Sequence, residues 1–138
     1  MSLEFDLIPP GTRLESNGHG ASVEIRASES RTFYCVLVIT DQIEQESVDV
    51  SIWGSADGEN WGTQPYLRLP QRFYRGETRA VLELSASPEI SFIRASWELN
   101  RWGRVAPVPM FVLGLKVIEI PAMANRPKPV TVTASESA

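Results

Sequence analysis

The sequence predicts an all-β, single-domain sandwich of about eight or nine short strands with essentially no helix. Apolar and polar residues alternate in several short segments, as in strands with one buried face. Glycine, proline and other turn-forming residues separate these segments, and no stretch has the 3.6-residue apolar period of an amphipathic helix. At 138 residues the chain has the size of one domain, which we expect over residues 1–120, followed by a Pro/Ala/Ser/Thr-rich tail at 121–138.

The first part of the chain contains three expected strands. Residues 3–8 carry apolar side chains at alternate positions, and the two prolines and glycine that follow end this strand because proline cannot donate to a ladder. After a glycine-rich turn at residues 17–20, alternation resumes at residues 23–26. Residues 32–40 are apolar on both faces, which predicts a central strand covered on both sides. A helix of the same length is the competitor, and the β-branched and aromatic content favours the strand.

The clearest strand and turn lie in residues 48–61. Val48, Val50 and Ile52 fall on one face, which predicts that this face is buried. Asp57 and Gly58 follow as a turn, because glycine takes a positive φ without steric cost and aspartate accepts hydrogen bonds from the backbone ahead of it. The chain is therefore expected to reverse direction here.

The second half contains three more expected long strands. Residues 62–76 are irregular, and residues 79–84 alternate again. Residues 93–99 form the most regular half-buried strand, with Ile93 and Trp97 predicted to lie in the core. Residues 110–120 form the last long strand, in which Gly114 indicates a bulge or a close approach of another backbone.

Composition argues against several classes of partner. The net charge of -4 and the pI near 5.0 argue against nucleic acid, which requires a concentrated positive surface. No apolar run is long enough to span a membrane, and the first residues resemble neither a signal peptide nor an anchor. Cys35 is the only cysteine, which favours a reducing compartment. We expect a protein of the cytoplasm, or of a particle assembled there, without a cofactor.

Catalytic chemistry is difficult to build from these residues, so we expect no enzyme. His19 lies between glycines in a turn, and Cys35 lies among large apolar groups where a thiolate is poorly stabilised. The carboxylates Asp49, Glu83 and Glu98 occupy the polar faces of alternating strands, where a solvated sheet surface explains them. Residues 57–60 offer oxygen ligands for calcium, but the Asp-Gly turn accounts for Asp57 without a metal. No metal site is predicted.

Two loops are candidate binding surfaces. The first contains Arg101, Trp102 and Arg104, residue types enriched at binding hot spots. Its alternative is a tryptophan that folds back over the sandwich with an arginine stacked on it. The second contains Arg72, Phe73 and Tyr74, which equally fit a loop covering an open end of the barrel.

Residues 55–61, Ser-Ala-Asp-Gly-Glu-Asn-Trp, followed about thirty residues later by Phe92-Ile93-Arg94-Ala95, resemble a pattern of the discoidin-like (coagulation factor type C) modules. The resemblance covers about a third of the chain. It implies a jelly-roll sandwich and a binding role, in which loops at one end hold sugars, lipids or proteins. The terminal cysteines usual in that family are absent here, and its ligand loops cannot be aligned, so no binding residue is transferred.

These observations predict a non-catalytic β-sandwich that acts by binding itself or another protein, as a self-associating subunit of a particle, shell or phage-like assembly. The β-prone residues 130–133 in the tail suit an arm that adds a strand to a neighbouring subunit. The alternative is a carbohydrate-binding module with Trp102, Trp61 and Tyr66 as stacking platforms.

Overall fold

The computed structural model describes residues 2–102 and 110–121, which form nine strands and no helix. The strands are β1 (Glu4–Leu14), β2 (Gly18–His19), β3 (Val23–Glu24), β4 (Thr32–Gln42), β5 (Glu46–Ser55), β6 (Leu67–Arg68), β7 (Gly76–Glu83), β8 (Phe92–Arg101) and β9 (Phe111–Glu119). The predicted all-β fold is therefore confirmed. Without a helix, this part of the chain contains none that could cross a lipid bilayer.

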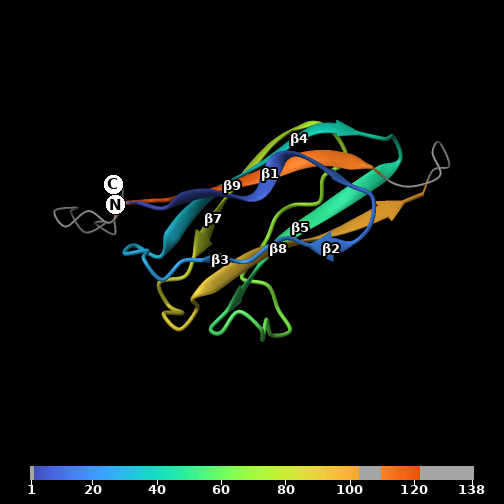
Figure 1. Ribbon diagram of the computed structural model, residues 1–138. Helices are drawn as coiled ribbons and strands as arrows, with labels where there is room; N and C mark the ends of the chain where they lie inside the picture. The colour runs from blue at the N-terminus through green and yellow to red at the C-terminus, as the bar shows by residue number, and fades with distance from the viewer. Residues whose placement is uncertain (1, 103–109, 122–138) are drawn as a thin grey trace, which may run out of the picture.

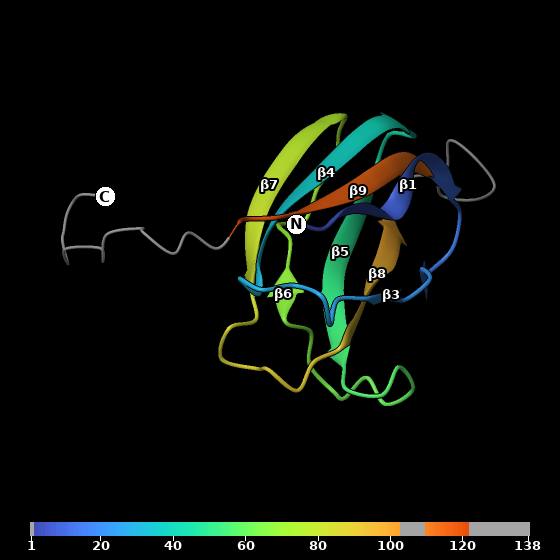
Figure 2. The same ribbon diagram turned by 60° about the vertical axis from the view of Figure 1, so that its left-hand side comes forward.

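The strands form two antiparallel sheets that stack as layers (Figure 1). One sheet has the order β1-β9-β4-β7, and the other has the order β2-β8-β5-β6, with β3 also paired to β8. Turning the molecule shows β7 at the outer margin of the first sheet, at the far side from β1 (Figure 2). The sandwich is established, whereas the jelly-roll path of the chain stays a prediction.

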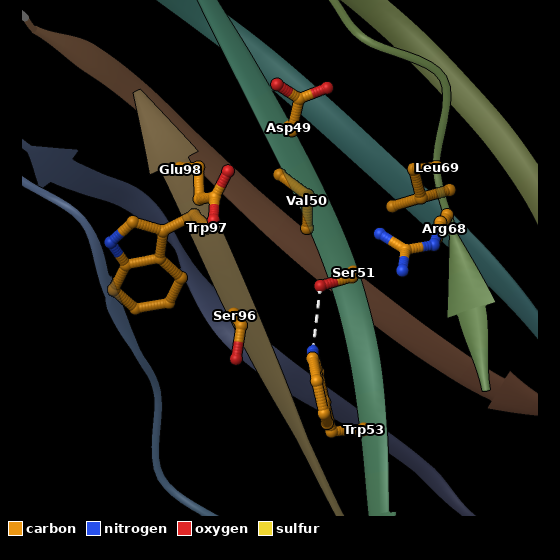
Figure 3. A pocket seen from close by; sticks show the side chains of 9 residues that line it. All are labelled: Asp49, Val50, Ser51, Trp53, Arg68, Leu69, Ser96, Trp97 and Glu98. Carbon is orange, nitrogen blue, oxygen red and sulfur yellow. Dashed lines mark hydrogen bonds between the residues drawn. The ribbon is translucent and has the colours of Figure 1, made fainter. Parts of the chain in front are cut away.

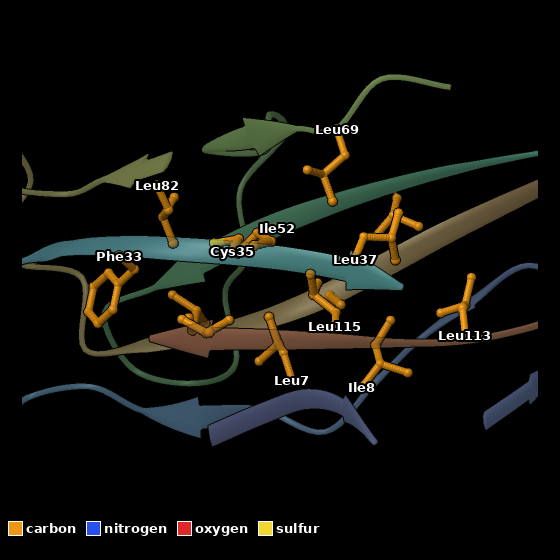
Figure 4. Packing of buried hydrophobic residues seen from close by; sticks show 14 of the residues in the cluster. Leu7, Ile8, Phe33, Cys35, Leu37, Ile52, Leu69, Leu82, Leu113 and Leu115 are labelled. Atoms are coloured by element: carbon orange, nitrogen blue, oxygen red, sulfur yellow. The ribbon is translucent and has the colours of Figure 1, made fainter. Parts of the chain in front are cut away.

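The core lies between the sheets and follows the alternation of the sequence (Figure 4). Val48, Val50 and Ile52 are buried on β5, as predicted. The facing sheet contributes the inward positions of β4, β7 and β9: Phe33, Cys35, Leu37, Ile39, Leu82, Phe111, Leu113, Leu115 and Val117. Because apolar burial stabilises by about 25 cal/mol per Å², these alternating faces hold the two layers together.

Cys35 lies fully buried in this core, as its position in a long apolar segment predicted. Desolvation by burial raises the pKa of the thiol to about 12, although a hydrogen bond with the backbone of Leu82 acts in the opposite direction. The thiol is therefore neutral at physiological pH and a poor nucleophile.

The first strand does not end at the prolines, so that prediction was wrong. β1 continues to Leu14 through a bulge, because Ile8 lies opposite Leu115 and Thr12 lies opposite Leu113. Three residues of β1 therefore lie opposite the single residue Gly114. A proline is tolerated there because β1 is an edge strand and the bulge needs no ladder hydrogen bond from it.

Two further expectations need correction. Gly18 and His19 of the expected turn form the short edge strand β2, paired with Trp97 and Ser96 of β8. The segment 32–40 is covered on one face only: Tyr34, Val36 and Val38 point away from the core and are half-buried, with no described layer over them.

The predicted core strand is right for Ile93 and wrong for Trp97. Ile93 is fully buried, whereas Trp97 is half-buried and packs at the margin of the core. Only the two-residue strand β2 lies beyond Trp97 in the sheet. The Trp97 indole Nε1 donates a hydrogen bond to the Ser16 carbonyl over 3.1 Å. Alternation identified the inward side of the strand, but the narrow sheet leaves this ring partly uncovered.

Candidate functional site

The two loops singled out in the sequence meet at one end of the sandwich. Phe73, Tyr74 and Trp102, called the aromatic end below, are exposed by 39%, 65% and 58%. The Phe73 and Trp102 rings lie 5.9 Å apart in an edge-to-face arrangement, and the Phe73 and Tyr74 rings lie 6.4 Å apart. Such ring geometries are favourable, so the three side chains form one surface.

Backbone hydrogen bonds hold one loop against β5 and the other against the residue that precedes β5. Arg72 and Val48 exchange two N–H···O bonds of 2.9 and 3.0 Å, which place the residues just before Phe73. The Trp102 N–H donates to the Gln45 carbonyl over 3.1 Å, immediately after the end of β8. The aromatic side chains are thus exposed, but the backbone that carries them is anchored to the sandwich.

The arginines predicted for this site have different surroundings. The Arg72 Nε donates to the Thr78 hydroxyl over 2.7 Å, and this contact directs its guanidinium along the start of β7. Arg101 is half-buried on β8, directly opposite the buried Glu46 of β5. Arg104 lies outside the described residues. The same holds for all residues of the tail after Pro121, including the expected arm at 130–133.

Trp102 does not fold back as a buried cap. More than half of its surface is exposed, and its aromatic neighbour is Phe73. The arrangement therefore favours the surface alternative for this tryptophan. A shallow cavity of about 210 Å³ is lined by Phe73, Tyr74 and the first residues of β7.

A second hollow, called the outer-face groove below, lies on the solvent side of the other sheet (Figure 3). It has a volume of about 240 Å³ and is surrounded by Asp49, Ser51, Trp53, Arg68, Ser96 and Glu98. Asp49 lies opposite Glu98, and Ser51 lies opposite Ser96 in the register of β5 and β8. The groove thus gathers carboxylate, hydroxyl, guanidinium and indole groups.

Hydrogen bonds position two of these groups. The Trp53 Nε1 donates to the Ser51 hydroxyl over 3.0 Å, and the indole ring is seen edge-on in Figure 3, so that one ring face is turned towards β8. The Gln71 side chain donates to Asp49 over 3.0 Å. Sequence reasoning placed Asp49 and Glu98 on a solvated surface; alternation showed their outward direction but not that their strands are neighbours.

Trp61, Tyr66 and Trp102 do not form one platform. The Trp61 ring lies 4.3 Å from the guanidinium carbon of Arg94, near the start of β8, whereas Trp102 follows the end of that strand. At about 3.3 Å per residue, the two tryptophans lie at opposite ends of the sheet. Trp61 and Tyr66 instead line a separate, open hollow of about 440 Å³.

Groups considered for catalysis or metal binding are dispersed. His19 is exposed on β2 of one sheet, and Cys35 is buried on β4 of the other. Asp57 Oδ1 accepts hydrogen bonds from the Glu59 and Asn60 N–H groups and the Ser55 hydroxyl. Those bonds, led by that of Asn60, lower the pKa of Asp57 to about 2. No group of three or more potential metal ligands gathers within residues 2–102 and 110–121.

Comparison with known proteins adds no assignment. No protein-family model matches the chain, and neither does any curated protein.

Proposed function

We propose that this protein is a non-catalytic β-sandwich that acts by binding, as a self-associating subunit of a larger assembly. The aromatic end carries the proposal. Three large rings from two loops stay exposed while their backbone is anchored, and clustered aromatic residues beside arginine are typical of protein interfaces. The rings offer both edges and faces, so a second copy can supply complementary contacts.

The resemblance to discoidin-like modules belongs to the same proposal. Its two segments lie side by side, with Ser55 opposite Phe92 and Trp61 stacked on Arg94. Gly58 has a φ of 82° in the turn between Ser55 and Trp61. This local agreement supports a binding module with a related turn.

The aromatic end is tested by replacing Phe73 and Trp102 together with alanine. We expect the double variant to weaken association through the aromatic end by at least about thirtyfold, because central aromatic contacts typically contribute 2 kcal/mol or more to an interface. Molar mass is measured by light scattering over a range of concentrations. The matched control is Tyr66→Ala, which removes another exposed ring far from Trp102 and should leave the mass unchanged.

Both exposed rings can be removed with little effect on folding, so the melting temperature should stay close to that of the wild type. A wild-type protein that remains monomeric at all concentrations would refute self-association. An oligomer whose mass is unchanged in the double variant would show that the aromatic end is not a contact of the assembly.

A second candidate function is carbohydrate binding, and the outer-face groove favours it. The apolar face of a sugar ring can stack on Trp53, while its hydroxyls can hydrogen-bond to Asp49, Glu98 and Arg68. The groove is open on the solvent side of the sheet, where a chain of sugars can lie across β5 and β8 (Figure 3).

Retention on immobilised polysaccharides tests this candidate. We expect Trp53→Ala to weaken binding by at least about tenfold through loss of the stacking surface. The control Trp102→Ala removes a tryptophan at the end of the sheet and should be retained like the wild type. Absence of retention on a broad panel, or equal retention of Trp53→Ala, would exclude a saccharide site in this groove.

A further inference from the structure

The outer strands of the two sheets differ in their capacity to pair with another chain. β1 carries Pro9 and Pro10 and two register shifts, which interrupt a regular ladder. β2, β3 and β6 contain two residues each. β7 pairs with β4 over eight residues without a shift. Among the described strands, β7 is therefore the long and regular edge, and Figure 2 shows it at the margin of its sheet.

The backbone groups that point outward from β7 follow from its ladder. The Leu84 N–H donates to the Arg31 carbonyl over 2.8 Å, on the side of β4. In an antiparallel pair, alternate residues direct both backbone groups towards the partner strand. Leu82, Ala80 and Thr78 therefore share the direction of Leu84, whereas the odd-numbered residues 77–83 direct their N–H and C=O groups away from β4.

The side chains of the same odd-numbered residues are arranged so that two antiparallel copies of β7 would place opposite charges against each other. On the outer face, Arg79 and Glu83 lie two residues before and after Val81. Val81 is 50% exposed. Arg79 forms an ion pair of 2.7 Å with Glu77, and these side chains are exposed by 58% and 51%. Glu83 accepts hydrogen bonds from the Thr32 hydroxyl and the Ser85 N–H, so pairing of two copies would exchange these contacts for contacts between chains. The inward residues Thr78, Ala80 and Leu82 carry no charge that would oppose pairing.

We propose that β7 pairs antiparallel with β7 of a second copy of this chain, about a two-fold axis at Val81. Arg79 then lies opposite the partner's Glu83, Glu83 lies opposite the partner's Arg79, and the two Val81 side chains meet at the axis. The odd-numbered residues form hydrogen-bonded pairs in this register, so the outward backbone groups of residues 79–83 are matched. The two sheets become one continuous sheet.

The charges of β7 favour pairing of this edge over its protection from pairing. Edge strands that avoid pairing carry prolines, inward-pointing charges or charged side chains, above all lysines, that repel an identical strand. β7 instead carries opposite charges placed symmetrically about an exposed β-branched residue, and opposite charges and β-branched pairs stabilise when they face each other across strands. A register centred on Thr78 also matches Glu77 with the partner's Arg79, but it pairs only the start of the strand.

The pairing rests on the proposed self-association and specifies its geometry. Phe73 and Tyr74 precede Gly76, the first residue of β7, so the aromatic end lies beyond the paired segment. A dimer formed through β7 keeps both aromatic ends for contacts with further copies. Such a subunit has one isologous contact and a second, separate contact, which suits a larger assembly.

A charge exchange tests the register. In Arg79→Glu, both opposing positions become acidic in a homodimer; in Glu83→Arg, both become basic. We expect each single variant to raise the dissociation constant of the β7 dimer by at least about tenfold. An equimolar mixture should recover the dimer, because every acidic position of one variant then lies opposite a basic position of the other. The double variant should also recover it.

The matched control is Arg13→Glu, which changes an exposed arginine beside Glu15 on the opposite edge of the same sheet. Dimerisation is measured by sedimentation velocity on the full chain, in which Phe73→Ala/Trp102→Ala serves as the background if larger assemblies obscure the dimer. Melting temperatures verify folding. Raising the salt concentration should reduce the difference between the single variants and the wild type.

Recovery in the mixture, with loss in both single variants, supports the β7 pair. An oligomer that is insensitive to both single variants overturns it while leaving self-association through the aromatic end intact. Loss in Arg79→Glu alone indicates another register and also overturns it. If deletion of residues 125–138 abolishes the dimer, the tail is the strand donor and the β7 pair is wrong. A monomeric wild type refutes self-association itself.

Discussion

Replacing Gly114 by alanine should destabilise the protein by about 3 kcal/mol or more, since overpacking against a rigid backbone exceeds the usual cost of an extra methyl group. A Cβ at this position would lie 2.6 Å from Pro10 Cα, 3.0 Å from Pro10 N and 3.3 Å from the Ile8 carbonyl oxygen. All three are backbone atoms, so no rotation of a side chain can relieve the overlap.

The overlap follows from the bulge in β1. Residues 9–11 lie opposite Gly114, which brings Pro10 over the outer surface of β9. An alanine would have to push β1 away from β9 and weaken the ladder on both sides of the bulge. The displacement of β1 should be seen at Ile8 and Thr12, the paired residues on the two sides of the bulge.

Chemical denaturation of the variant measures the loss. The matched control is Gly18→Ala on the edge strand β2, where the new Cβ would be 3.4 Å from the Trp97 indole and make an ordinary contact. We expect the control to change the free energy of unfolding by less than about 0.5 kcal/mol. A loss of under about 1 kcal/mol for Gly114→Ala would show that β1 can shift at little cost.

Replacing Glu119 by glutamine should lower the free energy of unfolding at neutral pH by about 3 kcal/mol. Glu119 is 2% exposed, and its carboxylate accepts hydrogen bonds from five donors. One oxygen binds the Leu3 N–H, and the other binds N–H and hydroxyl groups of residues 28–30. An amide has one acceptor oxygen, so one set of donors would face an NH₂ group.

The stabilisation of the folded protein by Glu119 should depend on pH in a defined direction. Desolvation raises the pKa of Glu119, but the hydrogen bonds outweigh it and lower the pKa from 4.5 to about 2. The unfolded chain therefore binds the proton more tightly than the folded one, and the stabilisation is complete above pH 4.5. It is lost as the pH falls from 4.5 through about 2, and below that pH both forms of the protein carry a protonated group.

Unfolding free energies of the wild type and Glu119→Gln are compared between neutral pH and pH 2. The difference between the two unfolding free energies should shrink progressively below pH 4.5. The other carboxylates titrate in both proteins, so their contribution cancels in this difference. Glu29→Gln is the control, because Glu29 is exposed and only its backbone N–H contacts Glu119. A difference that stays constant with pH would show that the charge of Glu119 is not responsible.

Features that depend on near neighbours in the chain could be predicted from the amino-acid sequence alone. The alternation of Val48, Val50 and Ile52 predicted their burial, and Asp57 with Gly58 predicted the turn that the structure shows. Gly114 predicted a bulge or a close backbone approach, and Pro10 makes this approach in the bulge of β1 opposite Gly114. These properties arise because the two-residue period of a strand and the backbone preferences of aspartate and glycine act over a few residues.

The pairing of the strands could not be predicted in this way, and neither could the candidate sites, which depend on that pairing. Alternation directs Asp49 and Glu98 outward but does not place them opposite each other, and nothing local connects Phe73 with Trp102. The buried role of Glu119 likewise depends on donors about ninety residues away in the chain. The physical reason is that antiparallel pairing is set by contacts between distant segments, whereas the pattern within a strand specifies only which of its faces is buried.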